Sequence, residues 1–119
     1  MPVGLTRDAG WEIGVSKTLP LPVATVWEFL VSPEGLALWL GPGAALPAEG
    51  DPALRGLRPG DRVRLTYGDT VLQVTVSPAS GDRTVLTFHQ EHLADAEERE
   101  RQRAHWKGVM AEIMRVLLP

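Results

Sequence analysis

The sequence contains no cysteine and no long hydrophobic run. The absence of cysteine excludes a disulfide framework and a thiolate nucleophile. No apolar stretch approaches the roughly 20 residues that a helix needs to cross a bilayer. Residues 1–10 also lack the continuous apolar segment that marks a secretory signal peptide. We therefore expect a cytoplasmic protein with no membrane span.

Positive charge is also in short supply. The 12 lysine and arginine residues are outnumbered by 15 acidic residues, which gives a formal net charge of −3. Such a chain has no basic field to hold nucleic acid, so we predict no nucleic-acid partner. The 119 residues are 44% hydrophobic and 23% charged, which is ordinary for one globular domain. We expect a single domain over residues 1–119, with residues 1–10 as a flexible N-terminal segment.

Motifs for metals, cofactors and catalysis are missing as well. His89 and His92 lie three apart on an expected strand, so their side chains point to opposite faces, and no HExxH motif is present. The Gly-Pro-Gly sequence at residues 41–43 lacks the third glycine and the preceding strand of a dinucleotide fingerprint. No P-loop or GxSxG motif occurs. We predict no metal site, no cofactor and no catalytic residues.

The first half of the chain predicts one strand and two short helices. Apolar and polar residues alternate over residues 11–19, which predicts a half-buried strand. Apolar residues at helical spacing predict a short helix over residues 23–30. A second short helix begins after Ser32, a favourable N-cap, with Pro33 at its first position. The glycines of residues 41–43 end it.

The second half predicts a loop, three strands and a long helix. We expect residues 44–59 to form a loop of about 16 residues, with a short strand near residues 45–48. Three alternating segments follow, joined by turns at residues 68–69 and 80–82, which predicts an antiparallel meander. Residues 95–118 then predict one helix, whose highly charged first half we expect to overhang into water while its apolar second half docks.

Three sequence motifs resemble one known superfamily. Residues 22–27 (PVATVW) resemble the P-x-x-x-V-W opening of the first helix in the SRPBCC (START-like, helix-grip) superfamily. Residues 32–39 (SPEGLALW) resemble the (S/D)-P-E-x-L-x-x-W motif of its second helix. Trp106, Met110 and Ile113 are similar to the W-x-x-x-L-x-x-L ending in the branch related to the Hsp90 ATPase activator C-terminal domain (AHSA1-like).

The resemblance implies an α+β helix-grip fold. Its antiparallel sheet would curve around a long C-terminal helix, with two short helices after the first strand and an apolar cavity between sheet and helix. Members usually carry more strands between the second and last helices, so this chain resembles a shortened member. Members of the superfamily bind lipids, hormones or polyketides, some catalyse cyclisation or dehydration, and some act as co-chaperones.

We therefore expect a small hydrophobic ligand between the sheet and the C-terminal helix. The candidate cavity residues are apolar walls and two polar groups near the mouth that share parity with Phe88: Trp39, Tyr67, Leu72, Val74, Phe88, Trp106, Met110 and Met114, with Gln90 and His92. The alternative is that the apolar residues pack a solid core and the two polar ones mark a strand end that reaches water.

Two other functions stay open at this point. The first is a protein-interaction module, either a homodimer or a co-chaperone-like partner, because missing strands would leave a sheet edge or apolar face uncovered. The second is a cyclase or dehydratase type of enzyme, for which Tyr67, Gln90 and His92 are the available polar groups. The sequence favours ligand binding first and enzymatic activity last.

Overall fold

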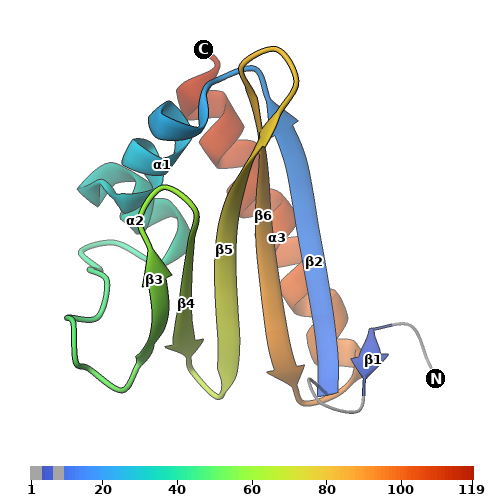
Figure 1. Cartoon of the computed structure of the whole chain (residues 1–119). Helices are drawn as coiled ribbons and strands as arrows, with labels where there is room; N and C mark the ends of the chain where they lie inside the picture. Colours follow the sequence, from blue (N-terminus) through green and yellow to red (C-terminus); the bar gives the residue numbers. More distant parts are fainter. Residues whose placement is uncertain (1–3, 7–9) are drawn as a thin grey trace.

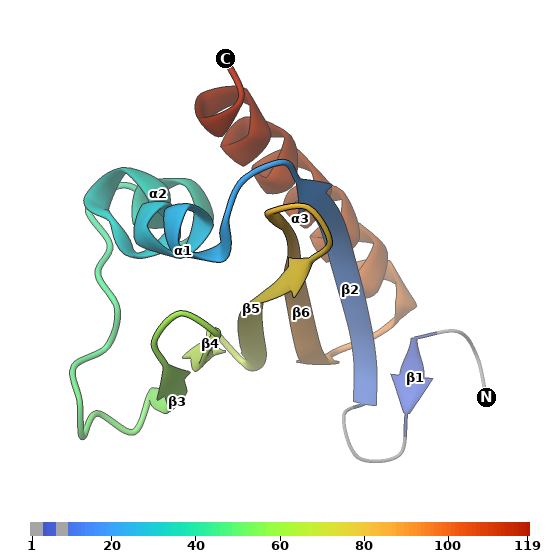
Figure 2. The ribbon, with the colours of Figure 1, turned by 45° about the horizontal axis from the view of Figure 1, so that its top comes forward.

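The structure, a computed structural model, describes residues 4–6 and 10–119 and has two layers. One layer is an antiparallel sheet and the other is formed by three helices that pack on its concave face (Figures 1 and 2). The elements in chain order are β1 (Leu5–Thr6), β2 (Gly10–Leu19), α1 (Val23–Val31), α2 (Pro33–Trp39), β3 (Leu54–Arg58), β4 (Arg62–Tyr67), β5 (Thr70–Ala79), β6 (Arg83–Leu93) and α3 (Ala96–Leu117).

The order of strands across the sheet is β1-β2-β6-β5-β4-β3. The three strands β4, β5 and β6 form the predicted meander, and β2 joins it by pairing antiparallel with β6. α3 runs along the β2 and β6 side of the sheet (Figure 1). The first and last strands of the expected pattern are therefore neighbours under the same helix, which confirms the α+β helix-grip architecture.

The second short helix begins where its predicted cap, Ser32, places it. The Ser32 side chain accepts a hydrogen bond from the Gly35 backbone N–H at 3.1 Å, and Pro33 occupies the first helical position of α2. The Ser32 hydroxyl also donates to the Phe29 carbonyl at 2.6 Å, so one residue ends α1 and starts α2. The Trp39 indole donates to the Leu30 carbonyl at 2.9 Å, which fixes the angle between the helices.

α3 starts where Asp95 caps it, because the Asp95 carboxylate accepts from the Glu98 backbone N–H at 2.8 Å. The prediction that the first half of this helix overhangs into water is wrong in part. Arg99 is half-buried, and its guanidinium donates to the Glu12 carbonyl of β2 at 2.8 Å. This hydrogen bond anchors the charged half of α3 to the sheet.

Two further predictions need correction or fall outside the described residues. The extra strand lies at Leu54–Arg58, where it pairs with β4, and not near residues 45–48. Of the expected flexible segment 1–10, residues 1–3 and 7–9 lie outside the described part of the chain. Its described residues Leu5 and Thr6 form β1, which pairs with Trp11 and Gly10.

Buried side chains from both layers form one apolar core. Its largest fully buried members include three aromatic residues, one from each of α2, β6 and α3: Trp39, Phe88 and Trp106. Phe88 lies between the two indoles, with ring centroids 6.3 Å from Trp39 and 4.8 Å from Trp106. Among the described residues, no helix is both long enough and apolar enough to span a membrane.

Two glycines allow a matched test of how closely α2 packs against α1. A Cβ at Gly35 would overlap the backbone carbonyl of Phe29, whereas a Cβ at Gly108, in the middle of α3, would meet no described atom within 4 Å. We expect Gly35→Ala to lower the free energy of unfolding by about 1–3 kcal/mol, as overpacking does. Gly108→Ala should raise it by about 1 kcal/mol through helix propensity. Urea denaturation measures both, and equal effects at the two sites would contradict the close α1–α2 contact.

Candidate functional site

The structure separates the candidate cavity residues into three groups. Most of the apolar ones are buried in the core and contact one another there: Trp39, Leu72, Val74, Phe88, Trp106 and Met110. Tyr67 joins Gln90 and His92 at one end of α3, and Met114 lies beside Met110 on its other half. Two hollows lie at the margins of the layer between the sheet and α3, and both open to the surface.

A chain of hydrogen bonds occupies the position where we expected the polar mouth of a cavity. The Trp106 indole N–H donates to Gln90 Oε1 at 2.8 Å, and Gln90 Nε2 donates to Thr70 Oγ1 at 2.9 Å. The Thr70 hydroxyl in turn donates to the Tyr67 carbonyl at 2.6 Å. Gln90 is only 2% exposed, so its parity with Phe88 did place it inward. Its amide joins α3 to β5 and β6.

His92 does not follow Gln90 into the interior, because β6 contains a bulge. Ile13 pairs with Gln90 but Trp11 pairs with Leu93, so two steps along β2 match three along β6. His92 takes up the extra residue with a positive φ of 65°. Leu93 is consequently buried, and the His92 side chain is 47% exposed.

His92, Gln90 and Tyr67 line a hollow of about 420 Å³, which we call the polar pocket. It lies between the β4–β5 turn, the end of β6 and the first turns of α3, and its other members are mainly polar or charged: Gly68, Asp69, Thr70, Ala94, Glu98 and Gln102. Burial raises the pKa of the Tyr67 phenol above its ordinary value of 10.0, so the phenol is protonated at neutral pH and can donate a hydrogen bond to a guest. Chemically, the pocket suits water or a polar guest.

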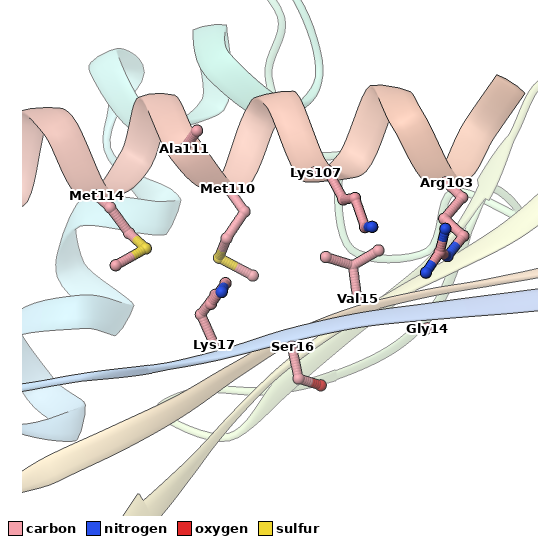
Figure 3. A pocket seen from close by; sticks show the side chains of 9 residues that line it. All are labelled: Gly14, Val15, Ser16, Lys17, Arg103, Lys107, Met110, Ala111 and Met114. Carbon is pink, nitrogen blue, oxygen red and sulfur yellow. The ribbon is translucent and has the colours of Figure 1, made fainter. Parts of the chain in front are cut away.

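A second hollow of about 490 Å³ lies where α3 crosses β2, and we call it the basic groove. Figure 3 shows Val15 pointing from β2 toward α3, and Met110 and Met114 pointing from α3 toward β2. In the described part of the chain, β1 pairs only with residues 10–11 of β2, so this stretch of β2 has no strand on its outer side. The groove opens there because the sheet ends there.

Three cationic side chains border the apolar floor of this groove. Lys17 comes from β2, and Arg103 and Lys107 come from consecutive turns of α3 (Figure 3). Lys17 and Lys107 are the only two lysines in the sequence. Sequence analysis missed this group, because the candidate list held apolar and aromatic residues and the two polar residues Gln90 and His92, and no lysine or arginine. The scarcity of lysine was the available signal, yet nothing in the sequence places the two side by side.

The convex face of the sheet carries a separate cluster of charged residues. Arg64 donates two hydrogen bonds to the Glu91 carboxylate, each 3.1 Å long. His89 lies 3.5 Å from both Glu91 and Glu12. The hydrogen bonds from Arg64 lower the pKa of Glu91. Arg64 is the main partner of the Glu91 carboxylate, and His89 lies beside it on the same face.

Comparison with known proteins gives matches to solved structures only. No protein-family model and no curated protein matches the sequence. DynU16, a protein in the dynemicin biosynthetic locus, superposes with a TM-score of 0.74 and 21% identity over 89% of this chain. A protein of unknown function from Enterococcus faecalis gives a TM-score of 0.75 with 14% identity, covering 95% of this chain and 74% of its own.

An AHSA1-like protein from Rhizobium etli decides the kind of fold. It superposes with a TM-score of 0.63 and 17% identity, covering 92% of this chain and 84% of its own. This chain shares the helix-grip fold of that AHSA1-like protein. At these identities the comparison establishes the helix-grip fold and not an activity. The chain spans about half the length of DynU16, 46% of it.

Within this helix-grip fold, the hydrogen bond between Trp106 and Gln90 can be tested by removing the acceptor. We expect Gln90→Leu, which keeps similar volume, to lower the free energy of unfolding by about 1–3 kcal/mol because the buried indole N–H loses its partner. Gln73→Leu, on the outer face of neighbouring β5, is the matched control and should change it by less than about 0.5 kcal/mol. Similar losses in the two variants, measured by urea denaturation, would show that Gln90 carries no special role.

The Arg64–Glu91 pair predicts a pH dependence of stability. Glu91 has a folded-state pKa below its ordinary value of 4.5, so its ionised form stabilises the fold above that pH. This contribution is lost as the pH falls through the lowered pKa. We expect Glu91→Gln to lower the free energy of unfolding by about 1 kcal/mol at pH 7, and the difference from the native protein to vanish in acid. The same change at exposed Glu49 should leave the pH profile unaltered, and a Glu91→Gln deficit that persisted at pH 2 would contradict the assignment.

Proposed function

We propose that this protein binds a small hydrophobic ligand between its sheet and α3, in the basic groove. The observation that carries the proposal is the apolar floor formed by Val15, Met110 and Met114 at an open junction of the two layers. Small-molecule sites are concave, mostly apolar and about 300–1,000 Å³ in volume. The groove, at about 490 Å³, falls in that range. Methionine side chains adapt to ligands of different shapes, which suits such a floor.

The other places considered for a ligand fit less well. The middle of the layer is filled by Trp39, Phe88 and Trp106, which are at most 1% exposed. In the polar pocket, the Gln90 amide is already bonded to Trp106 and Thr70. The floor of the groove includes Met110 and Met114, which the sequence marked as ligand-facing, and its rim is open.

One structural neighbour is compatible with a small-molecule role. DynU16 is described as a protein in the dynemicin biosynthetic locus. A ligand-binding function for this chain agrees with that setting.

The two alternatives have less support from the described residues. For an interaction module or homodimer, the relevant feature is Leu57 on edge strand β3, which is 46% exposed. A single exposed leucine is ordinary on a protein surface. For a cyclase or dehydratase, Gln90 carries no titratable proton, and its amide is bonded to Trp106 and Thr70. Its role is hydrogen bonding and packing, not proton transfer.

Methionine labelling tests the proposal directly. The chain has 3 methionines, and two of them line the groove. With ¹³C in the methionine methyl groups, we expect titration with 1-octanol to shift the NMR signals of Met110 and Met114 because the alkyl chain lies against them. Met114→Trp should fill the groove and abolish the shift of the Met110 signal.

The matched control is Val116→Trp, which adds the same ring on another face of α3, outside the groove. We expect it to keep the octanol-induced shift, and thermal unfolding should confirm that both variants fold. Octanol that left the Met110 and Met114 signals of the native protein unmoved would overturn the proposal.

A further inference from the structure

Among the described residues, the cations at the basic groove have no acidic partners. In the part of the chain that the structure describes, no ion pair joins Lys17, Arg103 or Lys107 to any carboxylate. Arginines elsewhere do form such pairs: Arg58, Arg64, Arg99, Arg101 and Arg115. The groove thus concentrates unpaired positive charge in a chain whose net charge is −3.

The three exposed cations stand close together when the groove is empty. Arg103 and Lys107 are four residues apart on one helix face, and like charges at that spacing repel each other. Lys17 adds a third positive charge from the strand opposite, as Figure 3 shows. An anion held among the three side chains would relieve the repulsion and would gain charge-assisted hydrogen bonds.

Resting on the proposed function, we infer that the ligand of the basic groove is an amphipathic anion. Its carboxylate or phosphate head lies among Lys17, Arg103 and Lys107, and its apolar tail lies against Val15, Met110 and Met114. The floor supplies the hydrophobic contact and the rim selects the sign of the head group. A neutral or cationic molecule with the same tail would leave the three cations unpaired.

Three probes with the same alkyl chain separate the head from the tail. Octanoate, octanol and octylamine are titrated into the protein while the methyl signals of Met110 and Met114 are followed by NMR. We expect octanoate to bind about tenfold more tightly than octanol, and octylamine most weakly. Raising the salt concentration should weaken octanoate and leave octanol unchanged, because salt screens exposed charges.

Matched variants then assign the effect to the lysines. The double variant Lys17→Gln/Lys107→Gln should weaken octanoate by about tenfold and leave octanol unchanged. The control Arg55→Gln/Arg62→Gln removes the same charge from β3 and β4, outside the groove, and should leave both probes unchanged. Lys17→Arg/Lys107→Arg keeps the charge and should keep the preference for octanoate. Thermal unfolding shows whether each variant is folded, and the glutamine variant should melt no lower than the native protein.

Three possible results would contradict different claims. Equal binding of octanoate, octanol and octylamine would overturn the anion inference and leave the hydrophobic groove standing. Failure of both octanoate and octanol to move the methionine signals would overturn the proposed function, and the inference with it. An equal loss of octanoate binding in the glutamine, arginine and control variants would show that the positive charge of the groove is not what recognises the head.

Discussion

The hydrogen bond between the Trp106 indole and the Gln90 amide is the contact on which the join between the two layers depends. A buried indole N–H needs an acceptor, and a buried amide among apolar residues needs partners of its own. The Trp106 Nε1–H donates to Gln90 Oε1 at 2.8 Å, so both groups have a partner. With that bond in place the Trp106 ring stacks on Phe88 and contacts Tyr67, with centroid distances of 4.8 and 5.7 Å. These three rings pack together between the layers, and the hydrogen bond holds α3 to β6.

Local patterns in the sequence predicted the elements well, and they failed where pairing between distant segments decides the outcome. Ser32 and Pro33 marked the start of α2 correctly because a helix cap depends only on its neighbours. The alternation of side chains along β6 also placed Gln90 inward correctly, because alternation likewise depends only on neighbouring residues. His92 departs from that parity because a bulge in the β2–β6 pairing adds a residue to β6. The sequence of residues 83–93 alone does not predict this bulge.

The basic groove illustrates the same limit for function. Lys17 lies on a strand near the start of the chain and Lys107 on the last helix, and each reads separately as a solvated charge. They become neighbours because β2 pairs with β6 and α3 crosses β2. The apolar half of the site was accessible to sequence reasoning, since Met110 and Met114 recur at helical spacing. The charged half could be recognised only after the strand pairing and the path of α3 were known.

The size of the domain explains why binding would lie at the margin of the layer and not inside it. A cavity of about 300 Å³, near the lower limit for a ligand site, would cost about 7 kcal/mol at roughly 24 cal/mol per Å³. Small domains have a total stability of about 5–15 kcal/mol, so a chain of 119 residues has little to spare. Filling the interior with Trp39, Phe88 and Trp106 avoids that cost. An open groove beside the unpaired side of β2 would then offer apolar contact without an empty interior. The exposed cations at its rim would supply selectivity at the surface, where their charge remains solvated.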